Sequence, residues 1–524
     1  MKKFLLFFVL MLVVHNLYSQ TASQPLELPN FIIEGKEQID VQVGTKQIPL
    51  LETYLARNYI DSLIIVGKPR NYVVFPVRLP NSIIARSFPS GYVDGNIGSF
   101  FTTNISAGYK SYFKDYEVYT FGNFGISGGH IENANYTKFA IGLQTDYIAP
   151  EKFYIFGKSK TTTNVDFDYK SYRLYATSEA PRRNQLDFSA KILSIGHFEG
   201  YDFQTGARFY TLNLASSGNS ISENLLGVFL EVVNKTHQNK MGGKLSLDFR
   251  STENKSTNFF QFEGCGQFVT GRLWLEPKLG FQLANSGFSK TRAMVLLDVV
   301  ARTNLNENFS LFARFANGLQ NKSIRNFFQI NPYISDSFAL DFCNATELQA
   351  KIKYQPNRAL AFVLSPTFFY NSRFPVLNIS RLGYFDISYI DASIFTLSLE
   401  GYWIIEKLGT VSTSLSLNAT KQNSNNKDVP TYPVLQYRID YSKVFWNKVK
   451  LAGYFEYLGR RYADLGNSLV LTSFGNLGLG VEYKINNSFV LTFNGDNLLN
   501  SNIVHWYGYK EWGLNLKLGL IYKF

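Results

Sequence analysis

Apolar and polar side chains alternate along the chain from about residue 90 to the C-terminus. The stretch 244–250 reads KLSLDFR, with Leu245, Leu247 and Phe249 on one face and polar or charged side chains on the other. A period of two places successive side chains on opposite faces of an extended strand. The pattern therefore predicts a series of β-strands, each with one apolar face and one polar face.

The final stretch of the chain shows the same division. One face is apolar and aromatic up to the C-terminal residue, and the other includes Lys517 and Lys523. The apolar face consists of Leu514, Leu516, Leu518, Leu520, Tyr522 and Phe524.

The connections between the candidate strands, of which we count about 22, alternate in length. Tight turns are predicted at 114 and at 149–151, 355–358, 404–408, 445–447 and 485–487. Longer loops are predicted at 165–185, 319–344, 373–390, 422–431, 460–467 and 499–509. Short turns on one rim and long loops on the other are typical of outer-membrane barrels, whose short turns face the periplasm.

A β-sheet whose apolar face meets lipid must also be closed. Hydrocarbon offers no hydrogen-bond partner to a strand edge, so a sheet in a membrane must close on itself. The sequence thus predicts an all-β fold, a closed antiparallel transmembrane β-barrel of about 22 strands over 90–524. A soluble β-sandwich also alternates, but it has no reason to sort its loops onto two rims.

The N-terminus predicts a secretory signal peptide over 1–19. Lys2 and Lys3 precede the apolar run from Phe4 to Val14, and Ser19 is a small residue at the expected cleavage site. The run is too short for a membrane-spanning helix. Residues 20–89 contain seven prolines, which disfavour a large regular domain. We expect 20–89 to form a short periplasmic arm or a reduced plug within the barrel lumen.

Composition agrees with this organisation. Aromatic residues make up 16% of the chain, which favours strands, and no apolar run after the N-terminus is long enough for a bundle of spanning helices. The formal charge of +12 falls to +10 without Lys2 and Lys3, and no basic run indicates nucleic acid as a partner. Cys265 and Cys343, the only cysteines, could form a disulfide or remain unpaired.

Nothing in the sequence indicates enzyme chemistry, a cofactor or a metal site. No two histidines have the i, i+4 spacing of a metal site on a helix, and the two cysteines lack a zinc spacing. The histidines are His15, His130, His197, His237 and His505.

Candidate ligand-binding residues lie in the two longest predicted loops. Rings and planar guanidinium groups give recognition surfaces a large contact area at low entropic cost. Loop 165–185 supplies Arg173, Tyr175, Arg182 and Arg183, and loop 319–344 supplies Arg325 and Tyr333.

Several short motifs resemble the barrel of TonB-dependent receptors. They are Asn494-Gly495-Asp496-Asn497-Leu498-Leu499-Asn500, Trp506-Tyr507-Gly508-Tyr509, Gly513, Tyr522-Lys523-Phe524 and Gly91-Tyr92-Val93-Asp94-Gly95-Asn96-Ile97-Gly98. The resemblance covers about 90–524 and implies a barrel of about 22 strands in the outer membrane of a Gram-negative bacterium. It also implies that the barrel-assembly machinery recognises the C-terminal strand through Tyr522 and Phe524.

The N-terminal segment departs from the family, whose plug is longer than 20–89. A stretch that resembles the family's TonB-pairing box consists of Phe31, Ile32, Ile33, Glu34 and Gly35. The resemblance implies uptake of an unknown solute with energy from TonB. The alternative is a receptor-like barrel without a full plug, which serves as a scaffold or docking ring for a separate plugging or accessory protein. An open passive pore is disfavoured because so wide a lumen would leak.

Overall fold

The computed structural model describes residues 90–524 apart from 217–218, 237–238, 253–254, 288, 337 and 406–407. The predicted signal peptide (1–19), the predicted arm or reduced plug (20–89) and the TonB-box-like stretch (31–35) lie outside the described residues.

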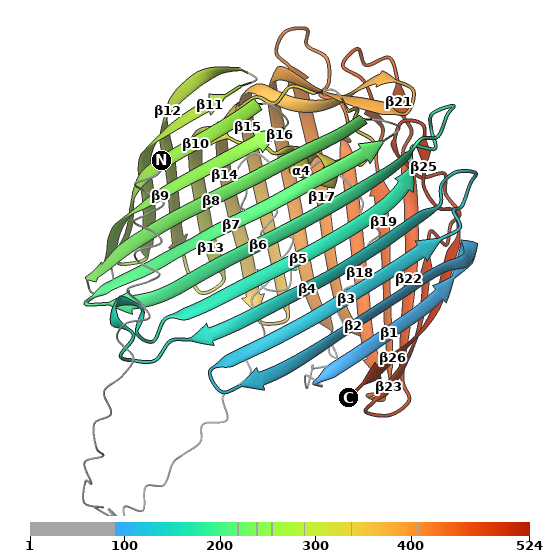
Figure 1. The fold of residues 1–524 in the computed structure, drawn as a ribbon, viewed down its shortest axis with the longest axis horizontal. Helices are drawn as coiled ribbons and strands as arrows, with labels where there is room; N and C mark the ends of the chain where they lie inside the picture. Colours follow the sequence, from blue (N-terminus) through green and yellow to red (C-terminus); the bar gives the residue numbers. More distant parts are fainter. Residues whose placement is uncertain are drawn as a thin grey trace, which may run out of the picture. The chain divides into compact units, whose positions relative to one another are not determined.

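The described chain forms a closed antiparallel barrel of 22 strands, as the alternating pattern predicts (Figure 1). Each barrel strand pairs with its neighbours along the chain, and the first strand pairs with the last. At the seam, the backbone of Gly91 exchanges two hydrogen bonds with that of Phe524, at 2.9 and 3.0 Å. The seam leaves no open strand edge facing the membrane.

The barrel strands are β1 (Gly91–Gly98), β2 (Thr102–Phe113), β3 (Tyr116–Ser127), β4 (Tyr136–Ile148), β5 (Lys160–Arg173), β6 (Arg182–Phe198), β7 (Tyr201–Ser216), β8 (Asn219–Thr236), β9 (Asn239–Thr252), β10 (Lys255–Thr270), β11 (Leu273–Ser286), β12 (Ser289–Asn304), β13 (Phe309–Gln320), β14 (Cys343–Asn357), β15 (Leu360–Arg381), β16 (Tyr384–Ile405), β17 (Gly409–Gln422), β18 (Leu435–Phe445), β19 (Val449–Leu458), β22 (Phe474–Lys484), β23 (Phe489–Asp496) and β26 (Asn515–Lys523). Outside the barrel wall, β20 (Arg461–Tyr462) pairs with β21 (Val470–Leu471), and β24 (Val504–Trp506) pairs with β25 (Tyr509–Lys510). The described helices are η1 (Ser99–Phe101), η2 (Tyr154–Phe156) and α4 (Ile324–Ile330). None of them is long and apolar enough to cross a membrane.

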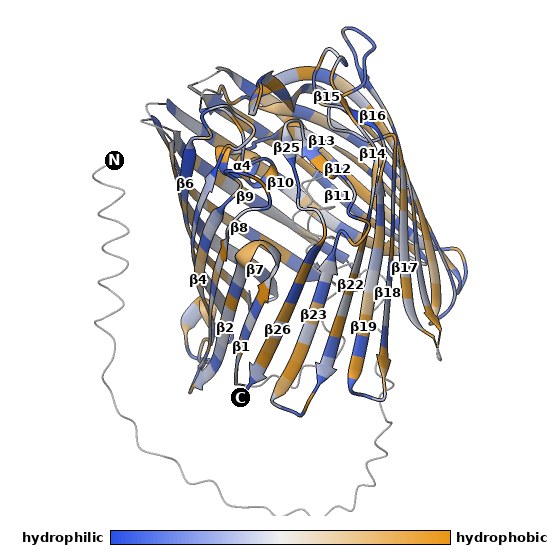
Figure 2. Ribbon diagram, turned by 90° about the vertical axis from the view of Figure 1, so that its right-hand side faces the viewer, coloured by the Kyte–Doolittle hydropathy of each residue, from blue (hydrophilic) through white to orange (hydrophobic). Residues whose placement is uncertain are grey.

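Hydrophobic and hydrophilic residues alternate along the barrel strands (Figure 2), and burial shows that the two faces of the wall differ as the sequence predicts. Along β26, Leu516, Leu518 and Leu520 are exposed on the outer surface, whereas the alternate residue Asn515 is buried on the inner face. Leucine side chains on the outside of a barrel gain their stabilisation from lipid rather than from a protein core. The apolar stripe along each strand therefore positions the barrel in the membrane.

Three predicted connections are wrong. The connection 149–159 is not a tight turn, because η2 extends it. Most of the predicted loop 165–185 belongs to β5 and β6, which leaves only 174–181 as a loop. The predicted loop 373–390 is a continuous hairpin of β15 and β16, joined by the two residues 382–383.

The β15–β16 hairpin was missed because alternation fails there. The four consecutive residues 374–377 are all buried, so this part of β15 is covered on both faces. The strand also changes register between Asn371 and Phe374, where Arg373 has a φ of 57°. A bulge of this kind bends a strand and alters its twist. Beyond the bulge, the hairpin no longer has a solvent face and a core face, and its sequence loses the period of two.

The other predicted long connections gather on one rim, which we call the loop rim. It includes 128–135, 174–181, 321–342, 423–434, 459–473 and 497–514, whereas the opposite rim has short turns at 114–115, 358–359, 446–448 and 485–488. Cys343 begins β14 and is buried, and Cys265 lies in β10. The two cysteines are unpaired.

We predict that Leu518→Lys destabilises the folded barrel by about 2–4 kcal/mol, the cost of a lysine on the lipid face near the bilayer midplane. As a control, Ser106→Lys places the same charge on the inner face opposite Asp94, where it should cost less than about 1 kcal/mol. Denaturant titration of folding into lipid vesicles measures both changes. Equal losses would show that the two faces do not meet different solvents.

Candidate functional site at the loop rim

The loops of this rim pack together through an apolar cluster, which we call the mouth cluster. It joins loop 321–342, the outer ends of β7 and β8, the β15–β16 hairpin and loop 497–514. Its buried members are Leu212, Leu214, Ile221, Ile324, Phe327, Phe328, Ile334, Leu340, Leu377, Phe385, Trp506 and Tyr509. Segments far apart in sequence are thus held together by a shared apolar contact at one end of the barrel.

Helix α4 is anchored to the barrel wall through Glu223 of β8. The backbone N–H groups of Ile324 and Arg325 donate to the two carboxylate oxygens of Glu223, each at 3.0 Å. Glu223 is fully buried and also accepts from the Tyr210 hydroxyl at 3.3 Å, with the Arg250 Nε 3.4 Å away. A carboxylate at the start of a helix satisfies free N–H groups and interacts favourably with the helix dipole. Glu223 therefore fixes the position of α4, which lies near the start of loop 321–342.

Two arginines attach the same loop to β6. Arg325 Nε donates to Asp187 at 2.7 Å, and the Arg325 guanidinium lies 5.0 Å from the ring of Tyr210. Arg183 is fully buried, donates to the carbonyl oxygens of Pro332 and Ile334, and pairs with Asp336 at 2.6 Å. Buried charges that are paired and hydrogen-bonded impose one geometry, because breaking a pair leaves an uncompensated charge.

A group of tyrosines connects loops 174–181, 321–342 and 497–514. The rings of Tyr333 and Tyr509 are stacked with centroids 3.4 Å apart, and Tyr175 meets Tyr509 edge-on at 4.9 Å. The Tyr509 hydroxyl donates to the carbonyl oxygen of Gly383 at the tip of the β15–β16 hairpin, at 2.7 Å. Tyr175 donates to the carbonyl oxygen of Lys510 at 3.0 Å. Residues 509–510 therefore join the loops to the hairpin.

Burial changes the titration of this region. It raises the pKa of Glu511 to about 7 and raises the pKa values of Tyr175 and Tyr333 above the ordinary tyrosine value. It also lowers the pKa of His130, whose Nε2–H donates to the carbonyl oxygen of Lys510 at 2.6 Å. The raised pKa of Glu511 means that the packed loops favour its protonated form.

The six predicted loop residues lie close to one another at this rim. Tyr175, Arg183 and Tyr333 contact the mouth cluster or the tyrosine group, and Arg325 is bonded to Asp187. Arg173 donates to the carbonyl oxygen of Ala180, and Arg182 donates to the Ser171 hydroxyl, so both support the turn 174–181. A role for any of the six in ligand binding stays a prediction.

Sequence reasoning missed the acidic partners of these arginines. The only sequence feature that could have identified Asp187 and Glu223 is a charge on the polar face of a predicted strand. Their partners lie 138 and 101 or 102 residues away along the chain, and no local pattern connects such positions.

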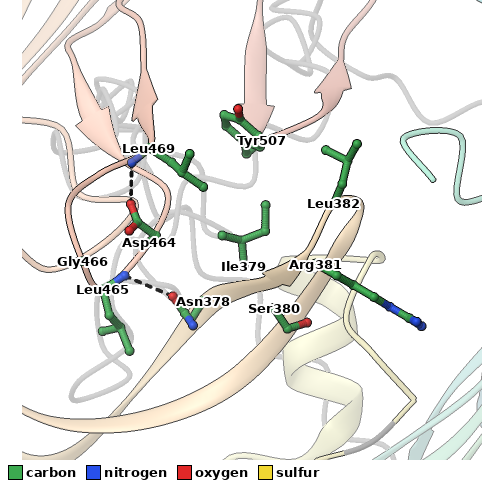
Figure 3. A pocket seen from close by; sticks show the side chains of 10 residues that line it. All are labelled: Asn378, Ile379, Ser380, Arg381, Leu382, Asp464, Leu465, Gly466, Leu469 and Tyr507. Carbon is green, nitrogen blue, oxygen red and sulfur yellow. Dashed lines mark hydrogen bonds between the residues drawn. The ribbon is translucent and has the colours of Figure 1, made fainter. Parts of the chain in front are cut away.

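A pocket of about 630 Å³ opens between the β15–β16 hairpin and loops 459–473 and 497–514 (Figure 3). Its apolar side chains are Ile379, Leu382, Leu465, Leu469 and Tyr507. Asn378 accepts the Leu465 N–H at 3.0 Å, and Asp464 accepts the Leu469 N–H at 2.7 Å (Figure 3). The first bond joins the hairpin to loop 459–473 and the second stabilises the fold of that loop, and together they leave an apolar surface open for a ligand. Within the described part of the chain, no group of three or more His, Cys, Asp and Glu side chains could hold a metal ion.

The barrel fold is similar to that of several solved structures. No protein-family model matches the chain, and no curated protein does. Among solved structures, the copper transporter OprC aligns with a TM-score of 0.67 at 12% identity, covering 83% of this chain and 80% of that one. The FrpB iron transporter from Neisseria meningitidis (F3-3 variant) aligns at 0.68 and 10% identity, covering 83% and 81%. The siderophore receptor PiuA from Acinetobacter baumannii aligns at 0.66 and 9% identity, covering 83% and 81%.

The chain shares the β-barrel fold of these transporters and receptors. Identities this low show the fold alone. The proteins compared are transporters and receptors rather than enzymes.

Removal of the Glu223 carboxylate should release loop 321–342 without unfolding the barrel. Glu223→Ala leaves two N–H groups of α4 and the Arg250 charge unpaired, a change that costs about 3–5 kcal/mol in buried pairs. Amide exchange over 324–330 should accelerate by about 100-fold or more. The control Glu231→Ala lies on the same strand beside Lys244, at 3.9 Å, and should leave exchange in α4 unchanged. Unchanged exchange in Glu223→Ala would contradict the anchor.

The packed loop 497–514 should loosen as pH rises. Glu511 has a folded-state pKa of about 7 against an ordinary value of 4.5, so its stabilising contribution is complete below about 4.5. That contribution is lost as pH rises to about 7 and changes little above it. Amide exchange in 503–512, corrected for intrinsic rates, measures the effect. Glu511→Gln should remove this dependence, and an identical dependence in that variant would assign it to another group.

Proposed function

We propose that this barrel is an uptake receptor, which binds a solute at the loop rim and passes it inward with energy from TonB. The observation that carries the proposal is the pocket between the β15–β16 hairpin and the two loops beside it. It lies on the rim that would face the medium, and it is built from segments that also pack over the barrel mouth. The barrel fold shared with copper, iron and siderophore transporters supports the same function.

The packed loops favour gated uptake over free diffusion. Loop 321–342 is held by Glu223, Asp187 and Arg183, which come from the inner face of the wall. A loop fixed inward by buried ion pairs narrows the barrel mouth. Passage of a bound solute then needs a rearrangement, and a rearrangement needs a source of energy.

The six predicted residues contribute to this function in two ways. Five of them position the loops at this rim, because their side chains are engaged within the protein: Arg173, Tyr175, Arg183, Arg325 and Tyr333. Arg182 is exposed at the start of β6, so it can meet a solute directly.

The segment 20–89 serves in this proposal as a reduced plug or a periplasmic arm, and residues 31–35 pair with TonB. The stretch 63–89, which directly precedes the barrel in the sequence, has four basic residues and no acidic residue. The inner face of the wall carries Asp94, for which no ion pair with another described residue is found, whereas Glu456 and Glu482 pair with Arg438 and Lys450. Opposite charges favour contact between the two.

The C-terminal strand is proposed as the signal for barrel assembly. Tyr522 and Phe524 both face outward and stack with centroids 5.4 Å apart, and Phe524 also stacks with Tyr109 at 6.3 Å. These rings lie at the seam where β26 meets β1.

A photo-cross-linking amino acid at Phe31, in the full-length chain in cells, tests the engagement of TonB. We expect a cross-link to TonB from Phe31 and none from the same group at Thr45, which lies outside the box-like stretch. Heat-dependent gel mobility checks that each barrel is folded. A folded barrel with no cross-link at Phe31 would contradict TonB-driven uptake and favour the alternative, a scaffold or docking ring for a separate protein.

A further inference from the structure

One buried arginine at the loop rim lacks a counter-charge. Arg461 of β20 is 4% exposed, and its Nη2 donates to the carbonyl oxygen of Val504 at 2.6 Å. No carboxylate of the described residues forms an ion pair with it, and its buried Nη1 has no hydrogen-bond partner. The ring of Phe474, 5.8 Å away, is its other close neighbour.

The other buried arginines of the described chain are paired. Arg183 pairs with Asp336 at 2.6 Å, and Arg250 pairs with Glu223 at 3.4 Å. A buried guanidinium without an acid is costly, so proteins rarely keep one unless something supplies the negative charge. Burial lowers the pKa of Arg461 only to about 10, so the side chain is charged at neutral pH.

His505 of β24 lies beside this arginine. It is 6% exposed, and its buried Nδ1 has no hydrogen-bond partner. Its ring meets that of Phe474 edge-on at 5.2 Å, and its carbonyl oxygen is 3.5 Å from the Arg461 Nη2. Burial and the charge of Arg461 lower the pKa of His505 to about 3, so at neutral pH it is an uncharged group. Its ring supplies no negative charge, but as the Nδ1–H tautomer it supplies a second donor.

Two buried nitrogen atoms without a hydrogen-bond partner, Arg461 Nη1 and His505 Nδ1, therefore lie on the two loops that form walls of the pocket. Arg461 is three residues before Asp464, and His505 is two residues before Tyr507, and both Asp464 and Tyr507 line the pocket. The missing group is negatively charged and accepts hydrogen bonds.

We propose that Arg461 and His505 form a binding site for an oxyanion, such as a carboxylate, phosphate or sulfate group. The Nη1–H groups of Arg461 and the Nδ1–H of His505 donate to its oxygens, and the guanidinium balances its charge. The oxyanion is either a free inorganic anion or the acidic group of the transported solute. The second source rests on the proposed uptake function, whereas the first does not.

Binding of inorganic phosphate and sulfate to the purified full-length protein in detergent tests the site. Titration calorimetry should give saturable binding of both anions at neutral pH, and the thermal midpoint should rise with either anion relative to chloride. Arg460→Gln is the matched control, because Arg460 is adjacent, exposed and bonded to the Tyr462 hydroxyl. This control should bind as the wild type does.

Arg461→Met should abolish the calorimetric signal and the thermal shift. In chloride alone it should be at least as stable as the wild type, because it removes an unpaired buried charge. If Arg461→Met does not fold, by heat-dependent gel mobility, His505→Phe keeps the arginine and should weaken binding at least tenfold. The proposal is overturned if the wild type binds neither anion, or if the arginine and histidine variants bind as tightly as Arg460→Gln.

A growth assay in cells distinguishes the two sources of the oxyanion. If the solute supplies it, Arg461→Met loses uptake-dependent growth and Arg460→Gln keeps it. If growth of Arg461→Met is normal while binding in detergent is lost, the site takes a free inorganic anion. A failed TonB cross-link with anion binding intact would refute the uptake function and leave the site standing.

Discussion

Hydrocarbon has no hydrogen-bonding groups, and this constraint determines most of the structure. Every backbone group in the membrane must be paired within the sheet, which is why β1 meets β26 and why Gly91 and Phe524 exchange hydrogen bonds at the seam. Lipid also favours apolar side chains on the outer face, so apolar residues recur at every second position of the strands. The buried charged residues of the wall lie on the inner face, where they are available to hold loops.

The loop rim uses those inner-face charges. Glu223 and Asp187 accept hydrogen bonds from α4 and Arg325, and Arg183 holds the next part of the same loop. The mouth cluster then packs above these contacts and includes the β15–β16 hairpin. The outer face of the wall thus contacts lipid, and the inner face positions the loops that form the candidate site. Arg461 stands out at this rim because its buried charge lacks the acidic partner that the others have.

The fold was largely predictable from the sequence, and the site was only partly so. Alternation in stretches such as 244–250 and 514–524 depends on local spacing alone, and it indicated a closed barrel with 22 strands. The loop residues Tyr175 and Tyr333 were found by their type and position, but their shared partner Tyr509 was not connected to them. The stretch 374–377 was assigned to a loop because its side chains are buried on both sides of the strand. Contacts between distant segments leave no periodic signal, whereas contact with a uniform solvent does.

Lipid exposure along β26 tests the central claim most directly. Single spin labels at each position from 515 to 523, in the folded protein in lipid bilayers, report collision with oxygen, which concentrates in lipid, and with a polar reagent, which does not. The account predicts an oscillation with a period of two residues, with oxygen favoured at 516, 518, 520 and 522. A flat profile, or polar reagent favoured at those even positions, would contradict a barrel whose apolar faces meet the membrane.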